Sequence, residues 1–205
     1  MITLAIDTAT AACSVALFDG ERLHARAHAI VGRGHAEQLL PMIAGLPGGG
    51  RADLILVDVG PGSFTGVRVG VAAARALALG WEARVAGYSS LALLAATAFA
   101  RTDDPALVAV LEAGHGEVFM QGFTASPLVA VDALASRPPA EALAMIGARR
   151  AIGDGTRRLA PLAPDRAFTE ALPDAADVLL LPPAFRALPP RPLYGRAPDA
   201  KPSAR

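Results

Sequence analysis

The sequence has few of the residues that common catalytic and metal sites need. Cys13 is the only cysteine among 205 residues, so an internal disulfide cannot form and a cysteine-based zinc or iron–sulfur site is excluded. The only lysine is Lys201, so the body of the chain offers none for a Schiff base or a P-loop. A single cysteine favours a reducing, cytoplasmic setting.

The sequence also has no excess of charge of either sign. Its 19 basic residues balance 19 acidic ones, and the balance holds in each half, with 8 against 9 in residues 1–104 and 11 against 10 in residues 105–205. Nucleic acids and anionic membranes attract proteins through positive surface charge. Neither is therefore expected to be bound through net charge alone.

Long apolar runs are missing as well. The most apolar stretch, residues 67–80, contains Arg68 and Arg75, whereas a membrane-spanning helix needs about 20 apolar residues. The chain reaches Asp7 without the basic segment of a secretory signal peptide. We therefore expect a soluble, cytoplasmic protein that does not contact a membrane.

Proline is scarce in the first half of the chain and frequent in the second. Three prolines precede residue 105, and the other 14 lie from residue 105 onward. Together with the turn residues at 101–105, this shift predicts a boundary between an N-terminal lobe, residues 1–104, and a C-terminal lobe, residues 105–205. From Pro189 onward the chain is rich in proline and basic residues, which predicts a solvated, partly flexible tail, or else a weak contact with an anionic partner.

The order of apolar runs and turn residues predicts an α/β protein. A hairpin is expected to turn at Gly20. Ser89 or Ser90 is expected to cap a helix, and Gly80 is expected to end the helix before it. The predicted strands are residues 2–6, 13–18, 21–30, 53–58, 84–87, 107–111 and 117–123. The predicted helices are residues 35–44, 67–79, 90–100, 139–146 and 175–181.

The loop at residues 60–66 is the segment best suited to bind an anion. It follows a predicted strand and precedes a helix, so its backbone N–H groups and the helix dipole could face a phosphate. It matches neither the P-loop pattern nor G-x-G-x-x-G, and a tight turn stiffened by Pro61 is the simpler explanation. The candidate residues are Gly60, Gly62, Ser63, Thr65 and Gly66.

Asp7 and Thr8, which follow the first predicted strand, form a second candidate. The carboxylate could orient a metal-bound water, and the hydroxyl could contact a phosphate. The simpler alternative is a turn in which both side chains bond their own neighbouring backbone.

Three stretches of the first half resemble the TsaB (YeaZ) family. They read DTAT at 7–10 with CSVAL at 13–17, HAEQLLP at 35–41, and GPGSFTGVRVG at 60–70. They follow the family's order and spacing within residues 1–100. Beyond residue 105, GEVF at 116–119 and PLYGR at 192–196 also resemble family landmarks, whereas EAGH at 112–115 replaces the family's Asp-Ala-Arg type of stretch.

The resemblance implies an actin/hexokinase/Hsp70-like (ASKHA) fold of two α/β lobes with mixed sheets. It also implies a subunit of the bacterial machinery that transfers threonylcarbamoyl to N6 of the adenosine following the anticodon in tRNA. In that machinery the TsaB-type subunit is non-catalytic, a TsaD-type subunit holds the metal and performs the transfer, and a TsaE-type ATPase joins them. The subunit is expected to form a homodimer when alone and to meet tRNA only through the complex.

Two features of the sequence agree with a non-catalytic role. His24 and His28 lie in a strand-like segment, and His35 has Leu39 four residues on, so no histidine pair shares a helical face as a metal site would need. A lone histidine at the start of a helix is more often a cap or a packing residue. Ala9 stands where the wider fold has the glycine of D-x-G-T, and its Cβ would crowd a phosphate. No cofactor is expected, and weak nucleotide binding stays open.

The resemblance places subunit pairing on the first two helices. Gly66, Gly70 and Ala74 would form a stripe of small residues, open to a partner helix or else packed on the protein's own sheet. The predicted interface residues are His35, Leu39, Leu40, Ile43, Val67, Gly70, Val71, Ala74 and Leu77.

The main alternative function is a stand-alone ATPase or phosphotransferase of the same fold, with Asp7, Thr8, Ser63 and Thr65 lining the phosphates. A peptidase fits poorly, because Ser63 has no evident histidine partner. One basic cluster is left without a role, in contact with either tRNA or water, and it consists of Arg149, Arg150, Arg157 and Arg158.

Overall fold

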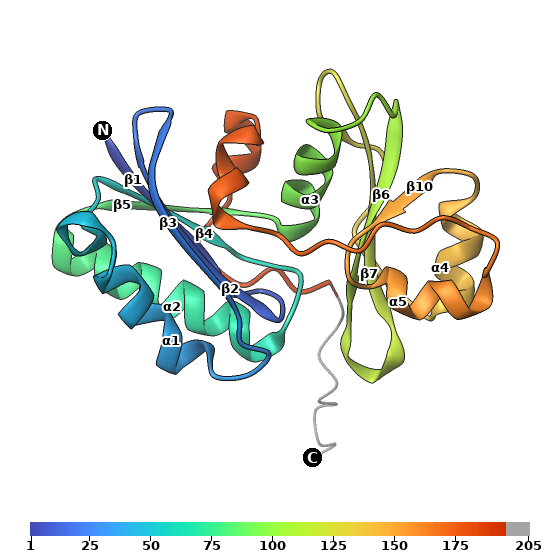
Figure 1. The fold of residues 1–205 in the computed structure, drawn as a ribbon, viewed down its shortest axis with the longest axis horizontal. Helices are drawn as coiled ribbons and strands as arrows, with labels where there is room; N and C mark the ends of the chain where they lie inside the picture. Colours follow the sequence, from blue (N-terminus) through green and yellow to red (C-terminus); the bar gives the residue numbers. More distant parts are fainter. Residues whose placement is uncertain (196–205) are drawn as a thin grey trace, which may run out of the picture.

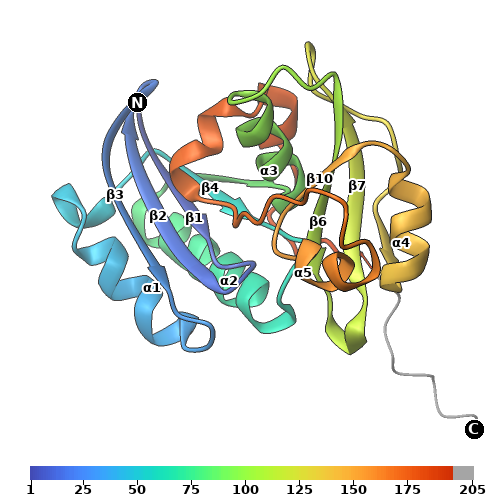
Figure 2. The same cartoon turned by 45° about the vertical axis from the view of Figure 1, so that its right-hand side comes forward.

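The computed structural model describes residues 1–195, which form two β-sheets side by side with helices on their outer faces (Figure 1). One α-helix and a 3-10 helix lie between the sheets, as the turned view also shows (Figure 2). No helix among these residues combines the length and apolar character needed to cross a membrane.

The first sheet is mixed and has the strand order β3-β2-β1-β4-β5. β1, β2 and β3 form an antiparallel meander, and β4 and β5 then add in parallel. β1 and β4 therefore end at the same edge of the sheet, which brings the segments that follow them together. The strands are β1 (Ile2–Asp7), β2 (Ala12–Asp19), β3 (Arg22–Ile30), β4 (Leu54–Asp58) and β5 (Arg84–Tyr88).

Two helices cover one face of the first sheet, α1 (His35–Ala44) and α2 (Phe64–Trp81), and they lie side by side in Figure 1. In α1 the buried positions are His35, Leu39 and Ile43, four residues apart, as a helix with one apolar face requires. A 3-10 turn (Pro47–Gly50) leads into β4.

The second sheet has the order β10-β6-β7-β8, with β9 paired to β7. Its strands are β6 (Ala106–Glu112), β7 (Val118–Thr124), β8 (Val129–Ala130), β9 (Ala135–Arg137) and β10 (Arg150–Ile152). α4 (Pro139–Ile146) and α5 (Thr156–Leu159) pack on one face of it. Two 3-10 turns accompany them, η2 (Gly114–Gly116) and η3 (Ala160–Leu162).

The space between the sheets is filled by α3 (Ser90–Phe99) and η4 (Ala175–Leu180). Their apolar residues share one core cluster with side chains from both sheets, including Phe18 and Phe123. α3 is buried almost all round, which explains why its sequence shows no polar face. A last 3-10 turn, η5 (Pro183–Arg186), contacts β5.

The predicted lobe boundary at 104/105 falls in the loop between α3 and β6. The segments after this boundary do not all stay with the second sheet. η4 returns to β1 and β2, and residues 187–195 return to β5 and to the loop after β4. The core cluster that includes α3 is likewise common to both sheets. The division of the chain into two lobes therefore stays a prediction.

Most predicted elements are confirmed to within two residues, and α1 and α4 have the predicted bounds. The second helix is an exception: α2 begins at Phe64, three residues early, and continues through Gly80 to Trp81. It starts early because the Ser63 hydroxyl accepts a hydrogen bond from Gly66 N and caps it. Gly80 does not end the helix. The helix ends at Trp81 and is followed by Glu82, whose backbone has the left-handed conformation of a helix C-cap.

The helix predicted at 175–181 is present over Ala175–Leu180, as the 3-10 helix η4 and not as an α-helix. Of the two predicted caps of the third helix, Ser89 occupies the capping position but its side chain makes no capping hydrogen bond, and Ser90 is the first residue of α3.

The first part of the predicted tail from Pro189 is solvated, since Pro189, Arg191 and Tyr194 are exposed, but its backbone is anchored to the protein. Leu188 exchanges two backbone hydrogen bonds with Gly87 on β5, and Leu193 N donates to Val59 O over 2.7 Å. These bonds hold residues 188–195 against the first sheet. The remainder of the predicted tail, residues 196–205, lies outside the described residues.

Candidate functional site

The segment after β1 and the loop after β4 contact each other directly. Thr8 Oγ1 donates to Gly66 O over 2.7 Å, and Ser63 N donates to Ala9 O over 2.7 Å. A Cβ at Gly62 would overlap the carbonyl of Ala9. The structure thus brings together the two candidate segments that the sequence singled out, with backbone packed against backbone.

This packing leaves a poor phosphate site. Three N–H groups of the loop already donate within the protein: Gly60 N to Asp58, Ser63 N to Ala9, and Gly66 N to the Ser63 hydroxyl. A phosphate loop works because such groups are free to point at the anion. These three N–H groups are therefore not available to a nucleotide phosphate, and the geometry adds no support for a stand-alone ATPase.

Asp7 and Asp58 form a buried pair at the shared edge of β1 and β4, and both side chains are fully buried. One oxygen of each is bonded: Ala9 N donates to Asp7, while Gly60 N and Ser90 Oγ donate to Asp58. The other oxygen of each meets no group outside the pair, and the two side chains interact with each other.

Burial raises the pKa of Asp58 to about 6. Burial also raises the pKa of Asp7 well above its usual range, and the nearby charge of Asp58 raises it further. Because two adjacent buried carboxyl groups cannot both ionise cheaply, we expect the pair to hold a proton at neutral pH. Asp7 thus bonds the backbone of its own turn, as the simpler alternative predicted. It is also one half of a structural pair with Asp58.

Sequence reasoning missed Asp58 and Ser90. A signal for Asp58 was available, since it ends a buried strand just as Asp7 does, and parallel neighbours end at one edge. Ser90 was considered only as a helix cap. Its hydroxyl instead donates to Asp58 over 2.7 Å and so ties the first turn of α3 to the first sheet.

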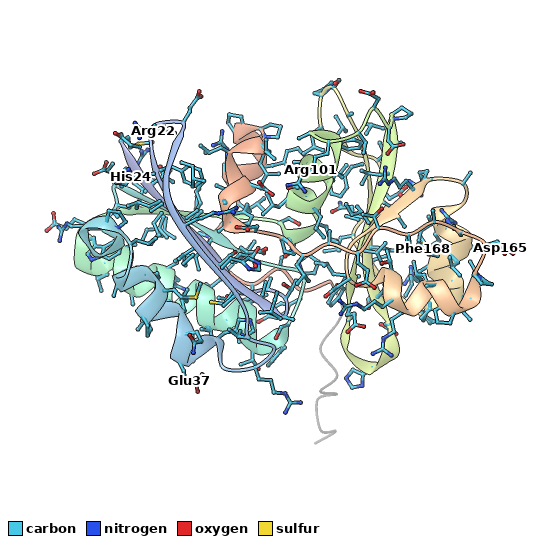
Figure 3. The ribbon with its side chains drawn as sticks, in the orientation of Figure 1. Arg22, His24, Glu37, Arg101, Asp165 and Phe168 are labelled. Atoms are coloured by element: carbon cyan, nitrogen blue, oxygen red, sulfur yellow. The ribbon has the colours of Figure 1, made fainter. Side chains whose placement is uncertain are left out.

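The histidines do not form a metal site within the described residues. His24 and His28 lie on β3, and His24 is at the edge of the molecule in Figure 3. His35 is buried, and its Nε2 lies 2.8 Å from Thr10 O and 3.1 Å from Ala12 O, so its interpretation as a packing residue is confirmed. Among residues 1–195, no three His, Cys, Asp or Glu side chains are grouped so that they could hold a metal ion.

Most residues predicted to face a partner lie in the protein's own core, and this part of the prediction needs correction. A Cβ at Gly66 or at Gly70 would overlap atoms of Thr8, so the small residues of α2 let that helix approach its own sheet. The stripe therefore serves the intramolecular packing that was its alternative explanation. The buried residues are His35, Leu39, Ile43, Val67, Gly70, Val71 and Ala74.

What remains for a partner is the outer face of α1 and α2, which points away from the sheet. Leu40 is 52% exposed, Leu79 is 84% exposed and Leu77 is half-buried. Glu37, also on this side of α1, points away from the molecule in Figure 3. We call the exposed residues of α1 and α2 the outer helical face.

The basic cluster left open by the sequence is paired with the chain's own acids. Arg149 binds Asp132 over 2.6 Å, and the neighbouring arginines also each contact a carboxylate. Their other ion pairs are Arg150–Asp104, Arg157–Glu170 and Arg158–Glu112. Internal neutralisation makes this cluster a weaker candidate for contact with tRNA.

Replacing Arg149 with alanine is expected to lower the free energy of unfolding by about 1–2 kcal/mol. Its guanidinium bonds Asp132, Met145 O and Ile146 O, so it holds the end of α4, and the Arg149–Asp132 pair is only about a third exposed. Urea unfolding of the full chain measures this. The Arg157→Ala variant, which loses an exposed pair, is the control, and an equal loss in both would contradict the account.

Two mixed sheets with helices on their outer faces, joined through a shared core, define the actin/hexokinase/Hsp70-like class of fold. Residues 27–126 match the family described as TsaD, tRNA N6-adenosine threonylcarbamoyltransferase. YeaZ from Pseudomonas aeruginosa has a similar structure, with a TM-score of 0.79 at 29% sequence identity over 94% of this chain and 99% of that chain.

Curated sequences give a more specific result. TsaB from Escherichia coli, described as a tRNA threonylcarbamoyladenosine biosynthesis protein, is 38% identical over 124 residues, which cover 58% of this chain and 53% of that protein. An uncharacterized Mycobacterium tuberculosis protein is 33% identical over 219 aligned positions, covering 98% of this chain and 94% of that protein. The chain belongs to the TsaB (YeaZ) family. Its match spans about half the length of the curated TsaB protein.

Proposed function

We propose that this chain is the non-catalytic subunit of a cytoplasmic assembly that forms threonylcarbamoyladenosine in tRNA, where it binds and supports a TsaD-type catalytic subunit. Family membership and the names of the relatives support the pathway. The observation that carries the division of labour is the loop after β4, whose N–H groups at Gly60, Ser63 and Gly66 are used inside the protein.

The outer helical face is the proposed contact for the TsaD-type subunit. It offers apolar side chains, such as Leu40 and Leu79, on two helices already fixed to the sheet by their buried faces. Burying exposed apolar area contributes most of the affinity in such contacts. The same face would form a homodimer when the chain is alone, while a TsaE-type ATPase and tRNA join through the assembled complex.

Reconstitution with purified components tests the function. A TsaD-type subunit, a TsaE-type ATPase, the enzyme that makes the threonylcarbamoyl-adenylate donor, and tRNA are mixed with and without this chain, and modified adenosine is measured by mass spectrometry. We expect modification only when the chain is present. Equal modification without it would rule out the proposed role.

Replacing Leu40 with aspartate is expected to abolish this stimulation while leaving the melting temperature unchanged. The side chain is half exposed, so the fold tolerates a charge there, whereas a docked partner would have to bury that charge. Leu162→Asp, at an exposed leucine beside the second sheet, is the matched control and should stimulate normally. Full activity of the Leu40 variant would exclude this position from the contact.

A further inference from the structure

We propose that Arg68, held between Phe64 and Tyr194, is the polar anchor of the partner contact and binds a carboxylate of the partner protein. This inference rests on the proposed function, since it assigns a chemistry to one end of the surface that faces the TsaD-type subunit. We call the three residues the aromatic–arginine cluster.

The cluster has a defined geometry. Phe64 and Arg68 are four residues apart on α2, which places them on one face, and the guanidinium carbon of Arg68 lies 3.2 Å from the centre of the Phe64 ring. Arg68 Nη2 donates to the Tyr194 hydroxyl over 2.9 Å, and the guanidinium carbon is 5.5 Å from the centre of that ring. Two aromatic rings thus fix the guanidinium in place.

Tyr194 is itself held by the segment that returns from the second sheet. Leu193 N donates to Val59 O, and Gly195 packs so closely on the Phe119 ring of β7 that a Cβ there would overlap it. Leu188 is fixed to β5 by two backbone hydrogen bonds. The cluster is therefore assembled before any partner arrives, which lowers the entropy lost on binding.

The positive charge of Arg68 has no acidic partner among residues 1–195. The ion pairs of the described residues involve other arginines, such as Arg149 and Arg150, whereas Arg68 bonds only a neutral hydroxyl. One face of the guanidinium lies over the Phe64 ring and Nη2 bonds the Tyr194 hydroxyl, so the remaining N–H groups along its edge are what a ligand would meet. A planar guanidinium presented edge-on fits a carboxylate with two parallel hydrogen bonds.

The surroundings favour a protein over a nucleic acid as the source of the anion. Phe64 is 68% exposed and Tyr194 is 58% exposed, and large exposed aromatic rings beside an arginine are typical of the dominant residues in protein–protein interfaces. The other side chains of residues 59–74 are neutral, and Arg75 is the only further basic residue of α2, whereas nucleic-acid sites gather several basic residues. Phe64 also begins α2, so the cluster continues the outer helical face.

The test measures binding of the full chain to a purified TsaD-type subunit by calorimetry, with variants of the cluster. Arg68→Ala and Phe64→Ala are each expected to weaken binding at least about 30-fold, as the loss of a dominant interface residue does. Arg68→Lys keeps the charge but lacks the planar fork, so it should rescue only part of the affinity. Tyr194→Phe, which removes one hydrogen bond, should weaken binding about threefold to tenfold.

Arg51→Ala is the matched control, because Arg51 is exposed and precedes β4, at the opposite end of the strand from Phe64. It should bind normally, and melting curves confirm that the variants fold. Wild-type affinity of Arg68→Ala would overturn the inference and leave the proposed function standing, whereas no binding by the wild-type chain would refute the proposed function itself. If Arg68→Ala lost binding to tRNA but kept its affinity for the subunit, the anion would be RNA phosphate and the inference would be wrong.

Discussion

Replacing Gly66 with alanine is expected to lower the free energy of unfolding by about 3 kcal/mol, because the new methyl group would overlap a backbone oxygen. That oxygen is Thr8 O, and Thr8 also bonds Gly66 through its hydroxyl. The strand, the loop and α2 are all fixed by other contacts, so no part can move away cheaply. The melting temperature should fall by about 10 °C, as measured by calorimetry on the full chain.

The matched control is Gly80→Ala in the same helix. A Cβ at Gly80 meets no atom within 4 Å, so alanine there should add up to about 1 kcal/mol through its higher helix propensity. The same substitution thus has opposite effects at the two ends of α2. If Gly66→Ala left stability unchanged, the close contact between the segment after β1 and the start of α2, and with it the argument against a phosphate site, would be wrong.

Replacing Asp7 with asparagine is expected to stabilise the protein at pH 8, by about 1–3 kcal/mol, and to change how stability depends on pH. An asparagine amide can donate to the Asp58 carboxylate as a protonated Asp7 does, and its oxygen can still accept from Ala9 N. At pH 8 the folded wild type must keep Asp7 protonated to avoid two adjacent buried charges, which costs free energy, and asparagine removes this cost.

The sign of the pH effect follows from the raised pKa values of Asp7 and Asp58. A carboxyl whose pKa is higher in the folded state stabilises the fold fully below its unfolded pKa and loses this contribution as pH rises through its folded pKa. The contribution of the pair to the free energy of unfolding should therefore decline from about pH 4 upward. For Asp58 the decline passes through about pH 6, and for Asp7 it continues to higher pH. Urea unfolding between pH 4.5 and 8.5 should show the variant gaining on the wild type as pH rises. Asp165→Asn, at an exposed position, controls for the loss of one carboxyl group, and parallel pH profiles for wild type and Asp7→Asn would contradict the shared proton.

The elements that could be predicted from the sequence are those set by local pattern. The strand ending at Asp7 and the helix that begins at His35 are both defined by their own residues, since apolar runs and helical spacing need no distant partner. The motif at residues 60–70 was specific enough to indicate the family before the fold was known.

The features that could not be predicted depend on contacts between distant segments. The small residues of α2 read equally well as a partner face or a packing face, and only the position of Thr8 decides between them. The course of residues 188–195 depends on hydrogen bonds to Gly87 and Val59, about 100 residues and more away in sequence, and nothing in a proline-rich stretch indicates them. The pairing of Tyr194 with Arg68 has the same origin.

The central claim is that this chain works by docking a catalytic relative through the outer helical face. Sedimentation of the purified chain with a TsaD-type subunit tests it most directly, by comparing wild type, Leu40→Asp and the control Leu162→Asp. The account predicts a complex with the wild type and the control, and free subunits with Leu40→Asp. Free subunits in all three mixtures, or a complex that Leu40→Asp forms as readily as the wild type, would contradict it.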